Sequence, residues 1–296
     1  QLENEPVTLL AHDFLFTAAF DASSGAKLVR INKFDLEYQM QWPSGGQIVY
    51  QGPADQRKVH LFETPDGIGV VWSEIRDEID FDLFYQRYDL DGLPQLDSAG
   101  VTLMDGSWVD NYVEGIYSTP DGAFILVWVD DIWGAGSLKY QKFTTLAGEI
   151  ADSWPSDGYT LSSTGDPEKL KGSISASADG ILVAWEEFYN FNKNIKANII
   201  HWDGSLQWTG GLLLTTAEND QINLELAVDE LSQTAFVVWE DFQNGNDLDI
   251  VGQFLDLSNN SLYGDNIFIC DNDLYQQSPA VRRVNEGYYL IVWEDE

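Results

Sequence analysis

The chain has 296 residues, 44% hydrophobic and 13% aromatic, which is enough apolar material for a packed core and unlike a disordered chain. Its 49 acidic and 15 basic residues give a net charge of −34, which argues against nucleic acid and anionic membrane surfaces as partners. The sequence contains no run of 18 apolar residues, so it predicts no membrane insertion. The single cysteine, Cys270, excludes an intrachain disulfide.

An internal repeat runs through the whole chain. The phrase "YYLIVWEDE" at 288–296 recurs upstream as "GVVWSE", "ILVWVD", "LVAWEE" and "FVVWED", with tryptophan at positions 72, 128, 185, 239 and 293. Successive tryptophans are 56, 57, 54 and 54 residues apart. A further copy, "FLFTAAFDA", is expected to put Phe20 in the tryptophan position, 52 residues before Trp72.

Each period contains four short runs that predict β-strands. A first run, such as "KVHLFET" or "LELAVDE", ends in a turn that is often Asp-Gly, and the tryptophan run follows. After a variable loop come a third run, such as "DLFYQRYD", and a fourth, such as "GVTLMD". No capped stretch with a period of 3.6 residues predicts a helix.

Four antiparallel strands in each period of about fifty residues are typical of the blade of a β-propeller. The sequence therefore predicts an all-β propeller, 1–296, as a single domain with five complete blades and the first hairpin of a sixth. The expected blade limits are 5–52, 57–105, 110–163, 169–216 and 221–271, with the partial blade at 277–296. A closed ring of five blades has no place for the extra hairpin, so we expect an excerpt of a longer chain.

The apolar face of the last hairpin is expected to be covered, because an exposed strand edge invites aggregation. Three partners could cover this face. They are the rest of blade six in a longer polypeptide, which we favour, strands from a neighbouring chain in a larger surface assembly, and the chain's own N-terminal strand near "EPVTLLAH".

Two series of polar residues repeat together with the tryptophans. A carboxylate lies two residues after each tryptophan, and an amide lies 13 or 14 residues after it: Glu74, Asp130, Glu187, Asp241 and Asp295, and Gln86, Gln141, Asn198 and Gln253. A spacing of two places the carboxylate on the tryptophan's face of the strand. Catalysis needs one site whereas a fold needs the same hydrogen bond in every blade, so we interpret both series as structural.

The string "VVWEDFQNGNDLDIVGQFLDLSNNSL" and the lead-in "NDLYQQSPAV" resemble the units of secreted bacterial tandem-repeat propeller proteins. Those units read roughly Q-x-x-P-x-V, then Asp-Gly or Gly-Gly, then V-V-W-x-D and D-I-Y-A-Q. The resemblance is best over 217–296, and the third-strand motif drifts to "DLFYQR" and "SLKYQK". It implies a secreted or cell-surface location, often with a C-terminal sorting domain, and assigns no activity.

Catalytic motifs are absent from the sequence. The nearest match to a sialidase box, "SADGILVAW", lacks one residue, and no nucleophile elbow, phosphate loop or HExxH motif occurs. Carboxylates are too numerous for spacing to select a glycosidase pair. We therefore expect no enzyme but a binding or scaffold module for protein or glycan partners. The alternative is a glycoside hydrolase-like or lectin-type carbohydrate-active propeller.

Several aromatic residues outside the repeat fall on one side of the predicted blades, where strand two connects to three and strand four connects to the next blade. Exposed aromatics in loops bind sugar rings or anchor protein partners, although each could instead cover the edge of its own blade. The ligand-binding candidates are Trp108, Tyr112, Trp133, Tyr189, Phe191 and Tyr275. Trp42, Trp154 and Trp208 recur on the other side and are interpreted as structural.

The same side is acidic, which either keeps the protein soluble or holds cations. Calcium suits hard oxygen ligands, and the candidate ligands lie in "CDNDLYQQ" and "AENDQ": Asp271, Asp273, Glu218 and Asp220. No loop matches the Asp-x-Asp-x-Asp-Gly pattern, and no other cofactor is indicated.

Overall fold

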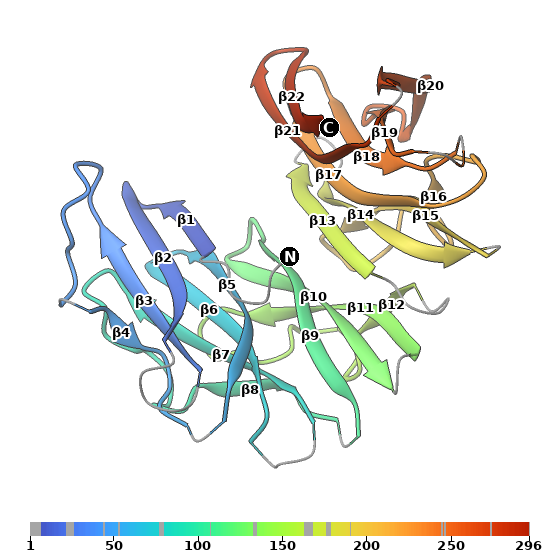
Figure 1. The fold of residues 1–296 in the computed structure, drawn as a ribbon. Coiled ribbons are helices and arrows are strands. Elements are labelled where there is room, and N and C mark those ends of the chain that lie inside the picture. The colour runs from blue at the N-terminus through green and yellow to red at the C-terminus, as the bar shows by residue number, and fades with distance from the viewer. Residues whose placement is uncertain are drawn as a thin grey trace. The chain divides into compact units, whose positions relative to one another are not determined.

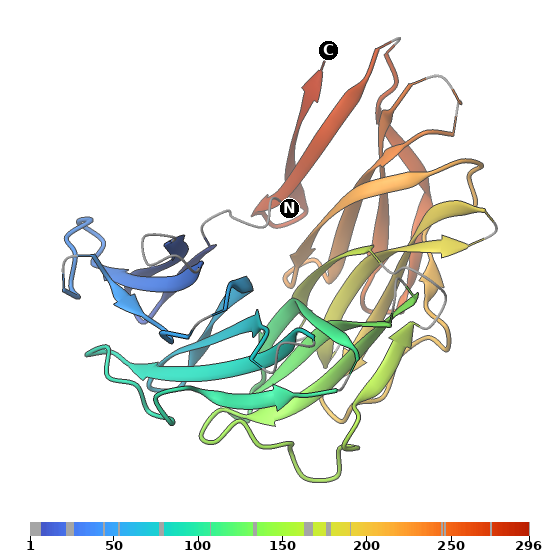
Figure 2. The same ribbon diagram turned by 60° about the horizontal axis from the view of Figure 1, so that its bottom comes forward.

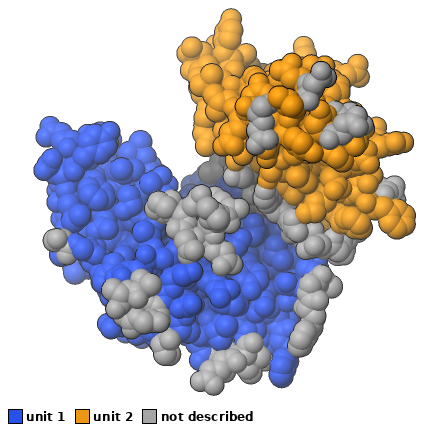
Figure 3. Space-filling view, in the orientation of Figure 1, with its two compact units in different colours: residues 1–160 blue, residues 161–296 orange. Residues whose placement is uncertain are grey.

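A computed structural model describes residues 7–21, 27–43, 45–52, 54–76, 80–106, 108–132, 135–162, 168–175, 179–189, 191–243, 245, 247–272 and 274–295. These residues form strands and turns, and among them no helix is long and apolar enough to cross a membrane (Figure 1). The chain divides into two compact units, residues 1–160 and 161–296 (Figure 3).

Three four-stranded antiparallel sheets, each made of consecutive strands, follow one another from the N-terminus. Blade one is β1 (Val7–Ala11), β2 (Phe14–Asp21), β3 (Leu28–Phe34) and β4 (Gln47–Ile48). Blade two is β5 (Gln56–Thr64), β6 (Gly67–Glu74), β7 (Asp82–Asp89) and β8 (Val101–Met104). Blade three is β9 (Asp110–Ser118), β10 (Ala123–Ile132), β11 (Ala135–Thr144) and β12 (Tyr159–Ser162).

Two further four-stranded sheets and one hairpin complete the fold. Blade four is β13 (Glu168–Ser175), β14 (Gly180–Tyr189), β15 (Asn192–His201) and β16 (Leu212–Leu213). Blade five is β17 (Gln221–Asp229), β18 (Thr234–Asp241), β19 (Asp249–Asp256) and β20 (Ser261–Cys270), and the hairpin is β21 (Gln276–Asn285) with β22 (Tyr288–Asp295). The predicted fold class, five blades and the first hairpin of a sixth, is confirmed; that they form one domain stays a prediction.

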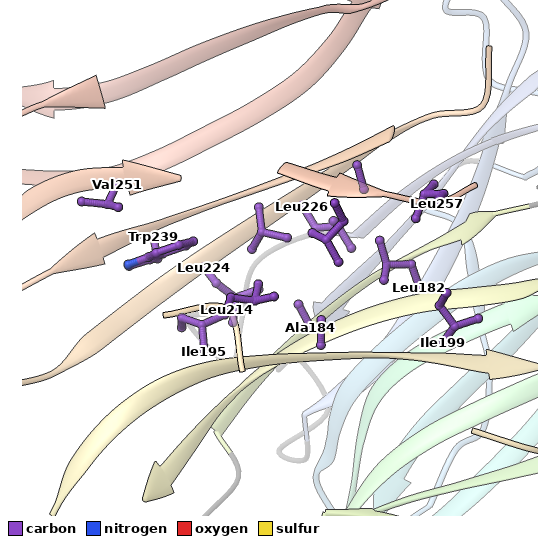
Figure 4. Packing of buried hydrophobic residues seen from close by; sticks show 14 residues of the cluster. Leu182, Ala184, Ile195, Ile199, Leu214, Leu224, Leu226, Trp239, Val251 and Leu257 are labelled. Atoms are coloured by element: carbon purple, nitrogen blue, oxygen red, sulfur yellow. The ribbon is translucent and has the colours of Figure 1, made fainter. Parts of the chain in front are cut away.

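Within each unit, neighbouring blades pack through buried apolar side chains of their strands. Within unit 2, Leu182 and Ile195 of blade four contact Leu224, Trp239 and neighbouring apolar residues of blade five in one buried cluster (Figure 4). The four tryptophans of the complete repeats at positions 72, 128, 185 and 239 are fully buried. Burial of such large apolar side chains contributes a major part of the stability of each blade pair.

Blade one departs from the expected alignment by one residue. In the other blades the third-strand amide pairs with the residue two positions before the tryptophan. Here Asn32 pairs with Thr17, which puts Ala19 in the tryptophan position and Asp21 in the carboxylate position. Phe20 therefore faces the other way and packs toward blade two, so its predicted place was wrong.

The four repeated amides hold the backbone at or just before the fourth strand. All four are fully buried. In blades two to four their side-chain nitrogens donate to backbone carbonyl oxygens of the turn that precedes this strand: Gln86 to Asp97 at 2.6 Å, Gln141 to Pro155 at 2.5 Å and Asn198 to Trp208 at 2.7 Å. In blade five Gln253 donates to Gly264, within β20, at 3.2 Å. The structural interpretation of this series is confirmed.

Gln86→Met should lower the free energy of unfolding by about 1–3 kcal/mol, because the turn loses a hydrogen bond and buried backbone groups lose a partner. Gln86 Oε1 also accepts the N–H groups of Arg87 at 2.9 Å and Leu96 at 3.1 Å. Urea denaturation measures the change, with the exposed Gln51→Met as the control. Equal stability of the two variants would contradict the structural role.

The hairpin β21–β22 is anchored to blade five on one face only (Figure 2). Arg283 Nε lies 2.8 Å from the buried carboxylate of Asp229, and the Ser278 N–H donates to Glu240 at 2.7 Å. On the other face Leu290 and Val292 are 55% and 52% exposed. An apolar strand face of this kind favours association with other strands.

Replacing both Leu290 and Val292 with lysine should reduce concentration-dependent association of this chain, while the unfolding midpoint stays nearly unchanged. Static light scattering over a range of protein concentrations measures the association. Val281→Lys serves as the contrast, because Val281 is fully buried against blade five and its replacement should loosen the hairpin. Unchanged scattering by the double variant would show that this face does not associate.

Candidate functional site

Trp108 lies in the connection between β8 and β9 and is 65% exposed. Its backbone φ of +71° is uncommon for a residue other than glycine. The carboxylate of Asp80 accepts the backbone N–H of Trp108 and that of Val109, the latter at 3.1 Å. Asp80 is buried, so the backbone that carries the exposed indole is fixed by a group inside the blade.

Residues next to Trp108 tie this connection to the start of β7. The N–H of Phe81 donates to Asp110 at 2.9 Å, and the N–H of Asn111 donates to the Phe81 carbonyl at 2.7 Å. The rings of Phe81 and Tyr112 are 5.4 Å apart, and the Arg57 guanidinium lies 4.6 Å from the Phe81 ring. Burial, with a contribution from Asp110, raises the pKa of Tyr112 to about 12. Tyr112 therefore supports this loop as a neutral phenol.

The remaining aromatic candidates occupy different connections. Phe191, between β14 and β15, is 92% exposed with a φ of +72°, and Tyr275, after β20, is 42% exposed. Trp133 and the side chain of Tyr189 lie outside the described residues. Of the predicted ligand residues that the structure describes, Trp108 and Tyr112 lie near the same connection, between β8 and β9.

The carboxylates that follow the tryptophans accept the indole N–H in three blades. The distances are 2.9 Å for Trp72 to Glu74, 3.0 Å for Trp185 to Glu187 and 2.9 Å for Trp239 to Asp241. In blades one to four a cation also lies against this carboxylate: Arg30 at Asp21, Arg76 at Glu74 (3.2 Å), Lys139 at Asp130 (2.5 Å) and Lys196 at Glu187 (2.6 Å).

Blade five lacks this cation, because the sequence contains no lysine or arginine between residues 197 and 281. A carboxylate stands opposite Asp241: Asp249 on β19 is its cross-strand partner, as Asp82 is that of Glu74 in blade two, where Arg76 is also present. Both side chains are almost fully buried, at 3% and 1% exposure. Opposed like charges in a buried setting favour the protonated form of one of them.

Burial first, and then the charges of Asp247, Asp241 and Asp271, raise the pKa of Asp249 to about 6. Burial also raises the pKa of Asp241, although its hydrogen bonds from Trp239 and Gln243 oppose the shift. Asp249 therefore holds a proton closer to neutral pH than an ordinary aspartate. Asp241, Asp247, Asp249 and Asp271 are named the blade-five acid group below. A buried acid with a raised pKa is a candidate for an active-site acid.

The edge of the blade-five acid group carries an exposed aromatic ring. The N–H of Gln276 donates to the carbonyl of Leu248 at 2.9 Å, which places Tyr275 beside the start of β19. Asp271 is exposed at the same strand ends. Sequence reasoning identified Asp271 and Tyr275 but missed Asp249 and Asp80. The absence of lysine and arginine over 197–281 was the available signal for Asp249.

Calcium binding stays a prediction. Glu218 and Asp220 are exposed, and Asp220 accepts the N–H of Lys193 at 2.8 Å. Asp273 lies outside the described residues, and among those that are described no three acidic, histidine or cysteine side chains are placed to hold a metal ion.

Comparisons with known proteins identify the fold and no family. No family model matches the chain, and no curated protein matches it. A thermostable family-43 glycoside hydrolase is similar in structure, with a TM-score of 0.50 and 9% identity over 91% of this chain and 96% of the other. Lower similarity is found to an endo-arabinase from Bacteroides thetaiotaomicron VPI-5482, with a TM-score of 0.47 and 10% identity over 93% and 97%. An α-L-arabinanase of Cellvibrio cellulosa, complexed with arabinohexaose, has a TM-score of 0.47 and 10% identity over 90% of this chain and 96% of the other.

The similarity to the family-43 glycoside hydrolase bears out the β-propeller fold. The prediction that this chain is not an enzyme is contradicted, because the solved structure that it resembles at a TM-score of 0.50 is that of a glycoside hydrolase. That prediction rested on a search for short motifs. Carboxylates brought together by strand register leave no motif in the sequence.

Asp249→Asn should stabilise the protein at pH 7.5 by on the order of 2 kcal/mol relative to wild type. The folded-state pKa of Asp249 is raised, so its contribution to stability is fully present below about pH 4 and is lost as the pH rises through about 6. Asparagine removes the charge that causes this loss, and the two proteins should differ little at pH 4. Urea denaturation at both pH values measures the effect. The exposed Asp265→Asn is the control, and no difference at pH 7.5 would contradict the raised pKa of Asp249.

Proposed function

We propose that this chain is a carbohydrate-active propeller of the glycoside hydrolase type, with Asp249 as the proton donor. The observation that carries the proposal is the buried Asp241–Asp249 pair of carboxylates, in a blade whose own sequence contains no lysine or arginine. The propeller fold, which the chain has in common with a family-43 glycoside hydrolase, supports the choice of reaction.

Hydrolysis of a glycosidic bond needs one carboxyl group that gives a proton to the leaving oxygen and a second, ionised carboxylate near the sugar ring. A donor works best when its pKa lies near the working pH, and that of Asp249 is about 6. The second carboxylate is supplied by Asp247 or Asp271. Because Asp249 is only 3% exposed, the substrate reaches it past the more accessible rim of Asp247, Asp271 and Tyr275.

Turnover of a panel of 4-nitrophenyl glycosides between pH 4 and pH 8 tests this function. Wild-type kcat should fall as the pH rises through about 6, because the donor must be protonated. Asp249→Asn should lower kcat at least about 100-fold, and Asp265→Asn should leave it unchanged. Absence of turnover with the whole panel, or full activity of Asp249→Asn, would reject the proposal.

The cellular location and wider organisation remain proposals of the same kind. We place the protein outside the cell or at its surface, in a longer modular chain, on the strength of the resemblance to secreted tandem-repeat propellers. Fractionation of the source cells, with the native mass measured by immunoblot, tests both statements. A cytoplasmic protein of the mass of this sequence would contradict them.

A further inference from the structure

Trp108 differs from every other tryptophan whose side chain the structure describes, because it alone is mostly exposed. The repeat tryptophans fill the contacts between blades, and Trp42 is 5% exposed. If Trp108 covered the edge of its own blade, its indole would be largely buried, and it is 65% exposed. Exposure of so large an apolar ring costs free energy that a ligand recovers on binding.

The loop holds Trp108 in place before any ligand arrives. The left-handed backbone conformation is strained for a tryptophan, and such strain persists only where surrounding contacts impose it. Here the contacts are the two N–H groups bound by Asp80 and the turn in which the Val109 N–H donates to the Gly106 carbonyl at 3.0 Å. A backbone that is already fixed loses little conformational entropy on binding.

Trp108 stands apart from the other exposed apolar side chains along the chain. Between Leu93 and Leu146, no other described large hydrophobic residue is mostly exposed. The second carboxylate oxygen of Asp80, Oδ1, is buried and accepts no hydrogen bond from the described residues. A single exposed flat ring fits a sugar, which offers C–H groups on one face and hydroxyls at its edge. A protein anchor instead needs a surrounding apolar rim.

We propose that Trp108 and Asp80 form a second carbohydrate-binding site, in unit 1, which holds a polysaccharide by stacking the indole on a sugar ring. The ligand class rests on the proposed function, whereas the site consists of other residues than the blade-five acid group. Asp80 fixes the indole through the backbone and is a positioning residue. The site increases the affinity for a long chain and plays no part in the chemical step.

Affinity gel electrophoresis in arabinan, xylan, pectin and mixed-linkage glucan tests the site. At least one polysaccharide should retard the wild-type protein, and Trp108→Ala should weaken this binding about tenfold or more. Trp108→Phe should retain part of the affinity, because it keeps a flat ring. Phe191→Ala is the matched control, since Phe191 is also exposed with a positive φ but lies in unit 2. Urea denaturation confirms that each variant is folded.

Measuring both turnover and gel retardation for each variant separates this proposal from the proposed function. Trp108→Ala should leave kcat on a small 4-nitrophenyl glycoside unchanged, and Asp249→Asn should lose turnover but keep the gel retardation. Retardation lost only in Trp108→Ala, without turnover in wild type, would uphold this site and reject the enzyme. The site would be overturned if Trp108→Ala were retarded as strongly as wild type, or if Phe191→Ala lost as much retardation as Trp108→Ala. It would also be overturned if no polysaccharide retarded the wild-type protein.

Discussion

The hydrogen bond from a buried indole N–H to a carboxylate is the constraint on which blades two, four and five depend. A tryptophan enclosed between two sheets needs an acceptor that lies within the same dry layer, because an unmet N–H is costly there. The carboxylate two residues on, as in Trp72 and Glu74, provides it from the same face of the strand. A buried carboxylate in turn needs a cation. In blade three this demand wins: Asp130 binds Lys139, and the Trp128 N–H has no acceptor among the described residues.

Blade five keeps the hydrogen bond from the indole to the carboxylate but has no cation of its own at that carboxylate. The Trp239 indole still donates to Asp241, but no lysine or arginine of its own blade balances the charge. The loss is met by a proton, since burial and neighbouring carboxylates keep Asp249 protonated to higher pH. Four blades place a cation at this carboxylate and one does not. In a repeat fold, a functional site is expected where one repeat departs from the pattern of the others.

The fold was predictable because its information is local: a tryptophan, a carboxylate and an Asp-Gly turn recur at a nearly constant spacing. The site was not, because its geometry comes from strand register. Asp249 stands opposite Asp241 only once β18 and β19 pair, and the two residues are eight positions apart in the sequence. Phe20 was misplaced for a related reason. In a strand whose tryptophan is missing, only the cross-strand partner Asn32 shows that Ala19 fills that position.

The contrast between Trp108 and the repeat tryptophans shows how one residue type serves two purposes in this fold. Inside the repeat, two packed sheets and a hydrogen-bond acceptor determine the position of the ring. A substitution of the tryptophan would therefore disturb both the packing and the hydrogen bond. In the connection between β8 and β9 only the backbone is constrained, by Asp80, and the side chain is left to the solvent. Binding surfaces can therefore vary at the connections while the blades keep their packing.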